Sequence, residues 1–176
     1  MAGIAPKRPV APAVRGQRFA VVVARFNEPI SKKLLDGALG ALAGHAVTGD
    51  RVEVHWVPGS FELGQAAMTL ARSRRFAGVV CVGVVIKGAT PHFDYVCSVA
   101  AHGIARAGLD TGVPVTFGVI TALTEEQAWE RAGGAVGNRG EEAALAALEM
   151  AAWRRARRGA PREPLTGRGR RARGKR

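Results

Sequence analysis

The sequence has few of the features that mark secreted, metal-binding or membrane proteins. Its only cysteines are Cys81 and Cys97, whose spacing suits neither a zinc site nor a disulfide framework and is typical of buried small side chains. No stretch approaches the roughly 18 consecutive apolar residues of a membrane span. The N-terminus also lacks the apolar core of a secretory signal. We therefore expect a cytoplasmic protein that binds no metal and contacts no membrane.

Several common catalytic motifs are missing as well. No apolar run is followed by a G-x-G-x-x-G fingerprint, and no Walker spacing occurs. No Ser/His/Asp order and no redox pair of cysteines stands out. The sequence thus gives little support to a protein that binds nucleoside triphosphates or dinucleotides.

Acidic residues are scarce at the two ends of the chain, although the formal net charge is +12. Residues 1–18 contain no acid, and Glu163 is the only acid after Arg154, so the stretch between the ends is close to neutral. We expect a flexible basic arm at 1–18, one folded domain at 19–158 and a disordered arginine-rich tail at 159–176. The tail is interpreted either as a solvated segment without a partner or as a binder of nucleic acid or anionic cargo.

Short apolar runs alternate with stretches of helical periodicity. The runs cover residues 19–24, 51–57, 79–86 and 114–120, and apolar residues recur at helical spacing between them. Runs that are apolar throughout are typical of strands buried on both faces. The alternation predicts an α/β fold with a four-stranded parallel sheet and helices on both faces.

In such a sheet, ligands bind beyond the carboxyl ends of the strands. That rule places residues 25–27, 59–62 and 87–92 at one rim together with Phe117. Residues 87–90, Lys-Gly-Ala-Thr, combine a cation, backbone N–H groups and a hydroxyl, which favours anion binding. Ser60 is expected to cap the helix that follows it.

Three residues near this rim are candidates for chemistry. His92 is the best acid–base group by position, although a capping or surface histidine would show the same pattern. Arg131 precedes the glycine-rich segment 133–140 and is interpreted either as a phosphate ligand or as an exposed helical arginine. Phe26 is placed either to stack on a planar substrate or to pack normally. The set suits proton transfer on a phosphorylated, partly aromatic substrate.

At these residues the chain resembles the 6,7-dimethyl-8-ribityllumazine synthase family of riboflavin biosynthesis, from about residue 19 to residue 153. The resemblance is carried by separate motifs in the right order, at residues 25–27, 56–62, 85–95, 130–133 and 137–140. It implies a flavodoxin-like three-layer α/β/α fold. It also implies a cofactor-free transferase that condenses 5-amino-6-(D-ribitylamino)uracil with 3,4-dihydroxy-2-butanone 4-phosphate to 6,7-dimethyl-8-ribityllumazine, with release of phosphate and water.

The same resemblance implies how the first substrate is held. Phe26 would stack on the pyrimidine ring, and Phe117 would line the pocket from the neighbouring subunit. Backbone groups of one strand end would hold the uracil edge, namely those of Val84, Val85 and Ile86. The ribityl chain would be lined by Ser60, Phe61 and Glu62.

For the second substrate, the resemblance implies that the phosphate is bound by Ala89, Thr90 and Arg131. His92 would move protons during Schiff-base formation and phosphate elimination, oriented by Glu142. Arg139 occupies a substrate-binding position where many members of the family have lysine, so the charge is kept but its geometry changes.

The family forms homo-oligomers, either pentamers or sixty-subunit shells, with active sites between adjacent subunits, and the resemblance implies the same here. Two alternatives remain open at this stage. One is an assembly or shell protein whose arginine-rich tail binds nucleic acid or anionic cargo. The other is a related activity on the same fold, such as the dismutation of two lumazines.

Overall fold

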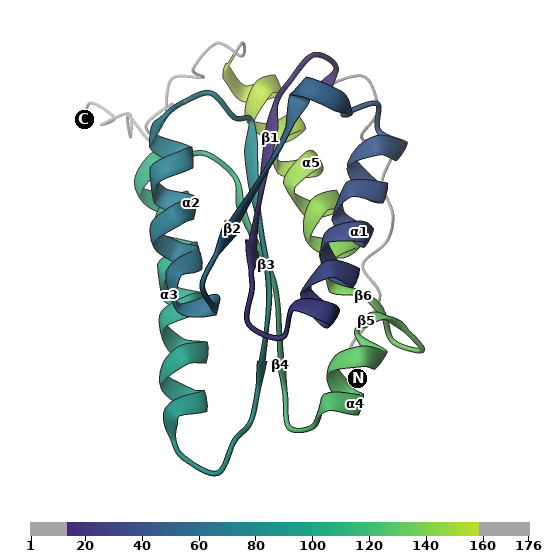
Figure 1. Cartoon of the computed structure of the whole chain (residues 1–176). Helices are drawn as coiled ribbons and strands as arrows, with labels where there is room; N and C mark the ends of the chain where they lie inside the picture. Colours follow the sequence, from purple (N-terminus) through teal and green to yellow (C-terminus); the bar gives the residue numbers. More distant parts are fainter. Residues whose placement is uncertain (1–13, 159–176) are drawn as a thin grey trace, which may run out of the picture.

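The computed structural model describes residues 14–158; residues 1–13 and 159–176, which contain most of the expected arm and tail, lie outside the described part. A parallel four-stranded sheet forms the middle of three layers, with strand order β2-β1-β3-β4 (Figure 1). The strands are β1 (Phe19–Ala24), β2 (Val52–Val57), β3 (Gly78–Ile86) and β4 (Val115–Ala122).

Two pairs of helices cover the two faces of the sheet (Figure 1). One face carries α1 (Glu28–Gly44) and α5 (Arg139–Arg158), and the other carries α2 (Leu63–Arg72) and α3 (His92–Thr111). The short α4 (Glu125–Glu130) follows β4, and single 3-10 turns occur at Gly49–Arg51 and Ser60–Glu62. The predicted three-layer α/β/α fold is confirmed, and its strand order is the flavodoxin-like one.

The residues of β1 explain why this sheet has a core on each face. All of its side chains are buried, and they alternate between two clusters. Val21 and Val23 belong to the cluster of α1 and α5, whereas Ala20 and Val22 belong to that of α2 and α3. Val14 is fully buried in the first cluster, so the packed part of the chain reaches back into the segment assigned to the basic arm.

The glycine-rich segment after α4 forms a small antiparallel hairpin of β5 (Ala132–Gly134) and β6 (Gly137–Asn138). Asn138 ties this hairpin to its neighbours. Its Nδ2 donates to the Lys33 carbonyl in α1 at 2.9 Å, and its Oδ1 accepts from the backbone N–H groups of Gly140 and Glu141 at 2.8 and 3.2 Å. It therefore caps the N-terminus of α5. The sequence predicted only a break in the helical pattern here.

Helices α2 and α3 approach each other at two glycines. A Cβ built on Gly64 would lie 2.7 Å from the Cα of Gly103, and one built on Gly103 would lie 3.2 Å from the Cα of Gly64. The atoms in the way belong to backbone, so neither helix can yield without moving as a whole. This close approach fixes the position of α3, which begins at His92.

We expect Gly64→Ala to destabilise the protein by about 1–3 kcal/mol, because a methyl group in this contact forces the helices apart. Gly40→Ala in α1 is the matched control, since a Cβ there meets nothing within 4 Å. At that exposed helical position alanine should be neutral or stabilise by up to about 1 kcal/mol. Urea unfolding of both variants measures the difference; equal stabilities would contradict the packing argument.

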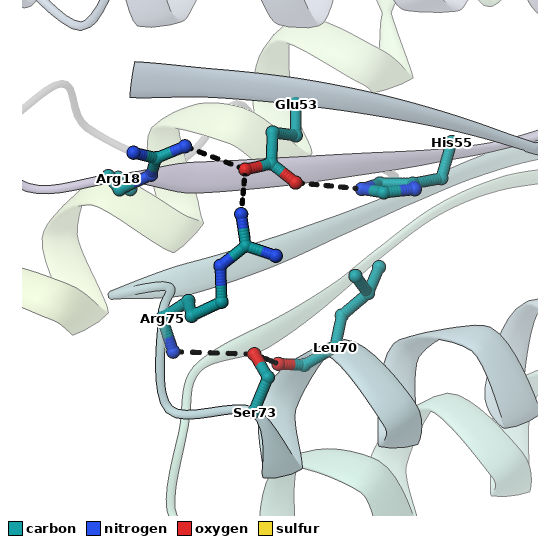
Figure 2. A network of polar contacts seen from close by, with 6 residues as sticks. All are labelled: Arg18, Glu53, His55, Leu70, Ser73 and Arg75. Atoms are coloured by element: carbon teal, nitrogen blue, oxygen red, sulfur yellow. Dashed lines mark hydrogen bonds and ion pairs between the residues drawn. The ribbon is translucent and has the colours of Figure 1, made fainter. Parts of the chain in front are cut away.

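At the opposite end of the sheet from α4, Glu53 on β2 gathers three basic side chains (Figure 2). Its Oε1 accepts from Arg18 Nη2 at 2.7 Å and from Arg75 Nη2, and its Oε2 lies 3.4 Å from His55 Nε2. Burial of the carboxyl opposes its ionisation, but the Arg18 hydrogen bond and the Arg75 charge outweigh burial, so the pKa of Glu53 lies below its ordinary value. The charged carboxylate links the starts of β1, β2 and β3.

A carboxyl with a lowered pKa in the folded state stabilises that state above its unfolded pKa, and this contribution is lost as the pH falls through the folded pKa. We therefore expect Glu53→Gln to unfold at lower urea concentration than the parent protein at pH 7. The gap between the two midpoints should narrow as the pH falls below about 4.5, near the ordinary range for glutamate. A gap independent of pH would show that the charge of Glu53 contributes nothing.

Candidate active site

A pocket of about 280 Å³ lies where the strands of the sheet end, on the side of α2 and α3. Half of the residues placed at this rim from the sequence line it. The lining consists of Phe26, Gly59, Ser60, Phe61, Val84, Val85, Ile86, Gly88, Thr90, His92, Phe93 and Val96. The volume is near the lower limit for small-molecule sites, so a single chain offers a modest cavity.

The ring of Phe26 is held out of the core by its own backbone. Its N–H donates to the Pro58 carbonyl at 3.2 Å, and its carbonyl accepts from the Ser31 hydroxyl at 3.3 Å. Asn27 follows in the left-handed region, with φ of 59°, a conformation that asparagine tolerates. The chain turns sharply there, and the Phe26 side chain stays 72% exposed at the pocket. Such a face can stack on a planar ligand.

Ser60 does not cap α2, contrary to the sequence-based expectation. Instead, the Glu62 side chain reaches back along the chain, and its Oε2 accepts from the backbone N–H of Gly59 at 2.9 Å. Ser60 is only 4% exposed, and its Oγ has no hydrogen-bond partner within the described chain. Since buried hydroxyls are nearly always paired, this atom is available to a group that enters the pocket.

The pocket wall on β3 has an unpaired edge. Strand β1 pairs with β3 only as far as Val82, whereas β4 pairs with it as far as Ile86. Residues 83–86 therefore project past β1, and among the described strands none lies on that side. Asn27 Nδ2 reaches the Val84 carbonyl at 3.5 Å. The remaining backbone groups on this edge are placed to hydrogen-bond a ligand as a strand would.

Gly83 lets the pocket wall close in on Ser60. A Cβ at residue 83 would lie 2.8 Å from Ser60 Oγ and 2.9 Å from the Cβ of Ala24. Any larger side chain would push Ser60 away from β3. The position of the unpaired hydroxyl thus depends on this glycine.

The third wall is the loop from Lys87 to Pro91 and the first turn of α3. His92 is the first residue of that helix, and Thr90 and Gly88 precede it in the lining. The first N–H groups of a helix have no partner within the helix and attract anions. His92 is exposed beside them, at a place where an imidazole can reach a bound molecule. This wall thus places the start of a helix beside an exposed imidazole.

A second group of predicted site residues lies apart from the pocket, around α4 and the start of α5. Arg131 Nη1 donates to the Gln127 carbonyl at 2.8 Å, and its carbonyl accepts from the Arg139 N–H at 2.9 Å. Arg139 also pairs with Glu142. None of the three basic or acidic side chains, Arg131, Arg139 and Glu142, lines the pocket of its own chain.

Three further predicted residues lie outside the lining. Phe117 is on β4, on the same face as Val119, which packs with α2 and α3; its ring is 45% exposed. Glu62 is next to the pocket but is engaged as the cap, and Ala89 is exposed in the loop. Phe117 on β4 and Arg131 at the end of α4 thus both lie outside the pocket of their own chain.

Sequence reasoning placed Gly59 and Gly88 at the rim, and both line the pocket, but it missed two lining residues, Phe93 and Val96. Phe93 and Val96 could have been found from their helical spacing after His92, because residues i, i+1 and i+4 share one side of the first turn.

Neither cysteine belongs to this chemistry. Burial raises the pKa of the Cys81 thiol in β3 to about 12, so the thiol stays protonated at neutral pH. Burial and the nearby Asp94 charge also raise the pKa of Cys97. A thiolate nucleophile is not favoured at either position.

Residues 16–155 match the model of the family described as 6,7-dimethyl-8-ribityllumazine synthase. The match includes both the pocket group and the Arg131 group. Within residues 14–158, no helix is long and apolar enough to cross a membrane. The match covers most of the chain and agrees with the fold, so this protein belongs to the 6,7-dimethyl-8-ribityllumazine synthase family, the transferases that carry out a condensation in riboflavin biosynthesis.

Proposed function

We propose that the protein condenses 5-amino-6-(D-ribitylamino)uracil with 3,4-dihydroxy-2-butanone 4-phosphate and releases 6,7-dimethyl-8-ribityllumazine, phosphate and water. Family membership supports the reaction class, and the pocket supports these substrates. No cofactor is needed for this chemistry, because it consists of amine addition to a carbonyl, dehydration, elimination of phosphate and ring closure. We also propose that the enzyme is cytoplasmic.

The observation that carries the proposal is the polar edge opposite an exposed aromatic ring. The projecting end of β3 offers backbone donors and acceptors to the edge of a uracil, while Phe26 covers the ring face. The buried Ser60 hydroxyl without a partner suits a ligand hydroxyl, as on a ribityl chain. Phe61 completes that side of the pocket. Val84, Val85 and Ile86 are thus proposed to act through their backbone.

The phosphate of the second substrate is proposed to bind at the start of α3. The first N–H groups of the helix and the Thr90 hydroxyl are proposed as hydrogen-bond donors, with Ala89 in the same loop. His92 then lies beside the phosphorylated carbon chain. Its imidazole can protonate the carbinolamine oxygen as water leaves and remove a carbon-bound proton as phosphate leaves.

We further propose that the active site is completed by a neighbouring subunit of a homo-oligomer, as a pentamer or a shell. Phe117 on β4 and Arg131 at the end of α4 both lie outside the pocket of their own chain, and both side chains are at least partly exposed. A neighbouring subunit's Arg131 would add the guanidinium that the phosphate site lacks, and a neighbouring subunit's Phe117 would close the ring pocket. Arg139 and Glu142, which are paired to each other, would assist from the same side, with Glu142 orienting His92.

Incubation of the purified protein with both substrates should produce the lumazine, seen by its absorbance and fluorescence, and one phosphate per product. Neither the uracil amine alone nor the butanone phosphate alone should give product. If the protein instead converts added lumazine to a flavin and ignores the two substrates, the related dismutation activity is correct and this proposal is wrong.

We expect His92→Ala to lower kcat by about 10- to 1000-fold, the size of a typical acid–base contribution. His102→Ala is the matched control, because His102 is exposed on the same helix and does not line the pocket. Steady-state assays of the two variants should separate them clearly. An unchanged rate for His92→Ala would remove that residue from the mechanism.

Sharing of the site between subunits can be tested by mixing two inactive variants. Co-assembly of His92→Ala subunits with Arg131→Gln subunits creates interfaces in which one subunit supplies His92 and its neighbour supplies Arg131. In an equal random mixture about a quarter of such head-to-tail sites are intact. The mixture should therefore regain about that share of the parent activity. Activity no higher than the average of the two variants would show that each chain uses its own Arg131.

A further inference from the structure

In the described part of the chain, charge is separated between the two ends of the sheet. Most acidic residues of the described chain lie toward the ends of the strands, where the pocket is; they are Glu28, Glu62, Asp94, Glu125, Glu126, Glu130, Glu141 and Glu142. The three lysines of the described chain lie at the same end, in the first turns of α1 and just after β3.

The opposite end is rich in arginine. Because the four strands are parallel, their first residues share one edge, and helices that return from the pocket end there (Figure 1). This edge, together with the last turns of α2 and α5, is called the basic pole. Its arginines are Arg15, Arg18, Arg51, Arg72, Arg74, Arg75, Arg154, Arg155, Arg157 and Arg158. The nearby acids Asp50 and Glu53 neutralise only a part of this charge.

The Glu53 cluster shows how the pole is built. Ser73 donates to the Leu70 carbonyl at 2.6 Å and accepts from the Arg75 N–H at 3.3 Å, which directs Arg75 toward Glu53 (Figure 2). Glu53 therefore satisfies Arg18 and Arg75 but lies away from the end of α5. Arg72, Arg74 and Arg158 are exposed, and no ion pair to a carboxylate is seen for them within the described residues.

Arginines at the end of α5 repel one another. Burial and then the Arg158 charge lower the pKa of Arg154, so the positive charges on this turn are held against an electrostatic cost. Arg157 lies over the Trp153 ring at 4.9 Å, and that ring is 53% exposed. An anion bound here would relieve the repulsion, and an unpaired base could stack beside it.

The composition of the pole favours phosphate groups in a chain. Guanidinium groups bind phosphate through two parallel hydrogen bonds, which lysine cannot do. The sequence beyond Arg158 adds Arg162, Arg168, Arg170, Arg171, Arg173, Lys175 and Arg176 to the same end of the chain. A lipid surface fits less well, because the exposed Leu109 and Trp153 come from helices on opposite faces of the sheet and form no single apolar stripe.

We propose that the basic pole binds single-stranded nucleic acid through its phosphates, without sequence preference. The pole and the pocket are separated by the length of α3, about 30 Å for twenty residues. Electrostatic effects in physiological salt fall off over about 8 Å. A nucleic acid on the pole therefore leaves the pocket open to its small substrates, and binding and turnover are independent.

The test measures the affinity of the full chain for a fluorescein-labelled oligouridylate of about 20 nucleotides, longer than a typical single-strand site, over a series of salt concentrations. Arg72→Gln with Arg158→Gln removes two charges from the pole. The matched control, Lys32→Gln with Lys33→Gln, removes two charges from the pocket end and gives the same net charge. Each phosphate contact on a single strand contributes about 0.7 to the slope of log affinity against log salt.

We expect the pole variant to bind more weakly and to lose about 1.4 from that slope, while the lysine variant binds as the parent does. Lumazine formation should be unchanged in the pole variant, so failure of this inference is separate from failure of the proposed function. Equal weakening in both variants would reduce the binding to a net-charge effect and overturn the proposal.

Two further arms complete the test. A full-length variant with Arg168, Arg170, Arg171 and Arg173 changed to Gln should still bind the oligonucleotide. Adding Arg72→Gln and Arg158→Gln to this variant should weaken the remaining binding. If the four tail substitutions abolish binding, the nucleic-acid site belongs to the tail alone. Vesicles of phosphatidylcholine and phosphatidylglycerol, at the same concentration of phosphate, should bind more weakly than the oligonucleotide; tighter binding to vesicles would also overturn the proposal.

Discussion

The pocket depends on one constraint, the unequal length of neighbouring strands. β3 continues for four residues past its last pairing with β1, while β4 supports it on the other side as far as Ile86. Strand β1 does not continue alongside β3, because the backbone N–H groups of Arg25 and Phe26 turn toward β2 and donate to the carbonyls of Val57 and Pro58. The turn opens the edge of β3 and aims Phe26 across it. Ligand contacts and strand termination thus have the same cause.

Much of the fold and of this pocket could be predicted from the sequence, because the signals are local. The apolar runs predicted the bounds of the strands closely, and β1 was predicted and is found at residues 19–24. The rule that parallel strands end at one edge then brought residues far apart in the chain together, and Phe26, Ser60, Thr90 and His92 do line one pocket. These predictions required only periodicity and topology.

The remaining features depend on contacts that periodicity does not encode. Ser60 looked like a helix cap, but its hydroxyl has no partner within the described chain, and the side-chain cap at this turn is Glu62, which accepts from the Gly59 N–H. The hairpin after α4 is set by Asn138, whose partner Lys33 is 105 residues away. Arg131 could not be placed by topology alone either, since its backbone carbonyl is held by the Arg139 N–H at the start of α5.

The distribution of charge over the fold also could not be predicted from the sequence. Counting residues gives a nearly neutral middle of the chain, but six of the ten pole arginines lie outside that middle, and only the fold brings them to one edge with the other four. A parallel sheet makes such separation easy, because every strand begins at one edge and ends at the other. Pocket-lining residues and strand-start arginines are therefore drawn from different segments. Selection can alter the basic edge without touching the residues that line the pocket, since the Glu53 cluster and the end of α5 share no residue with it.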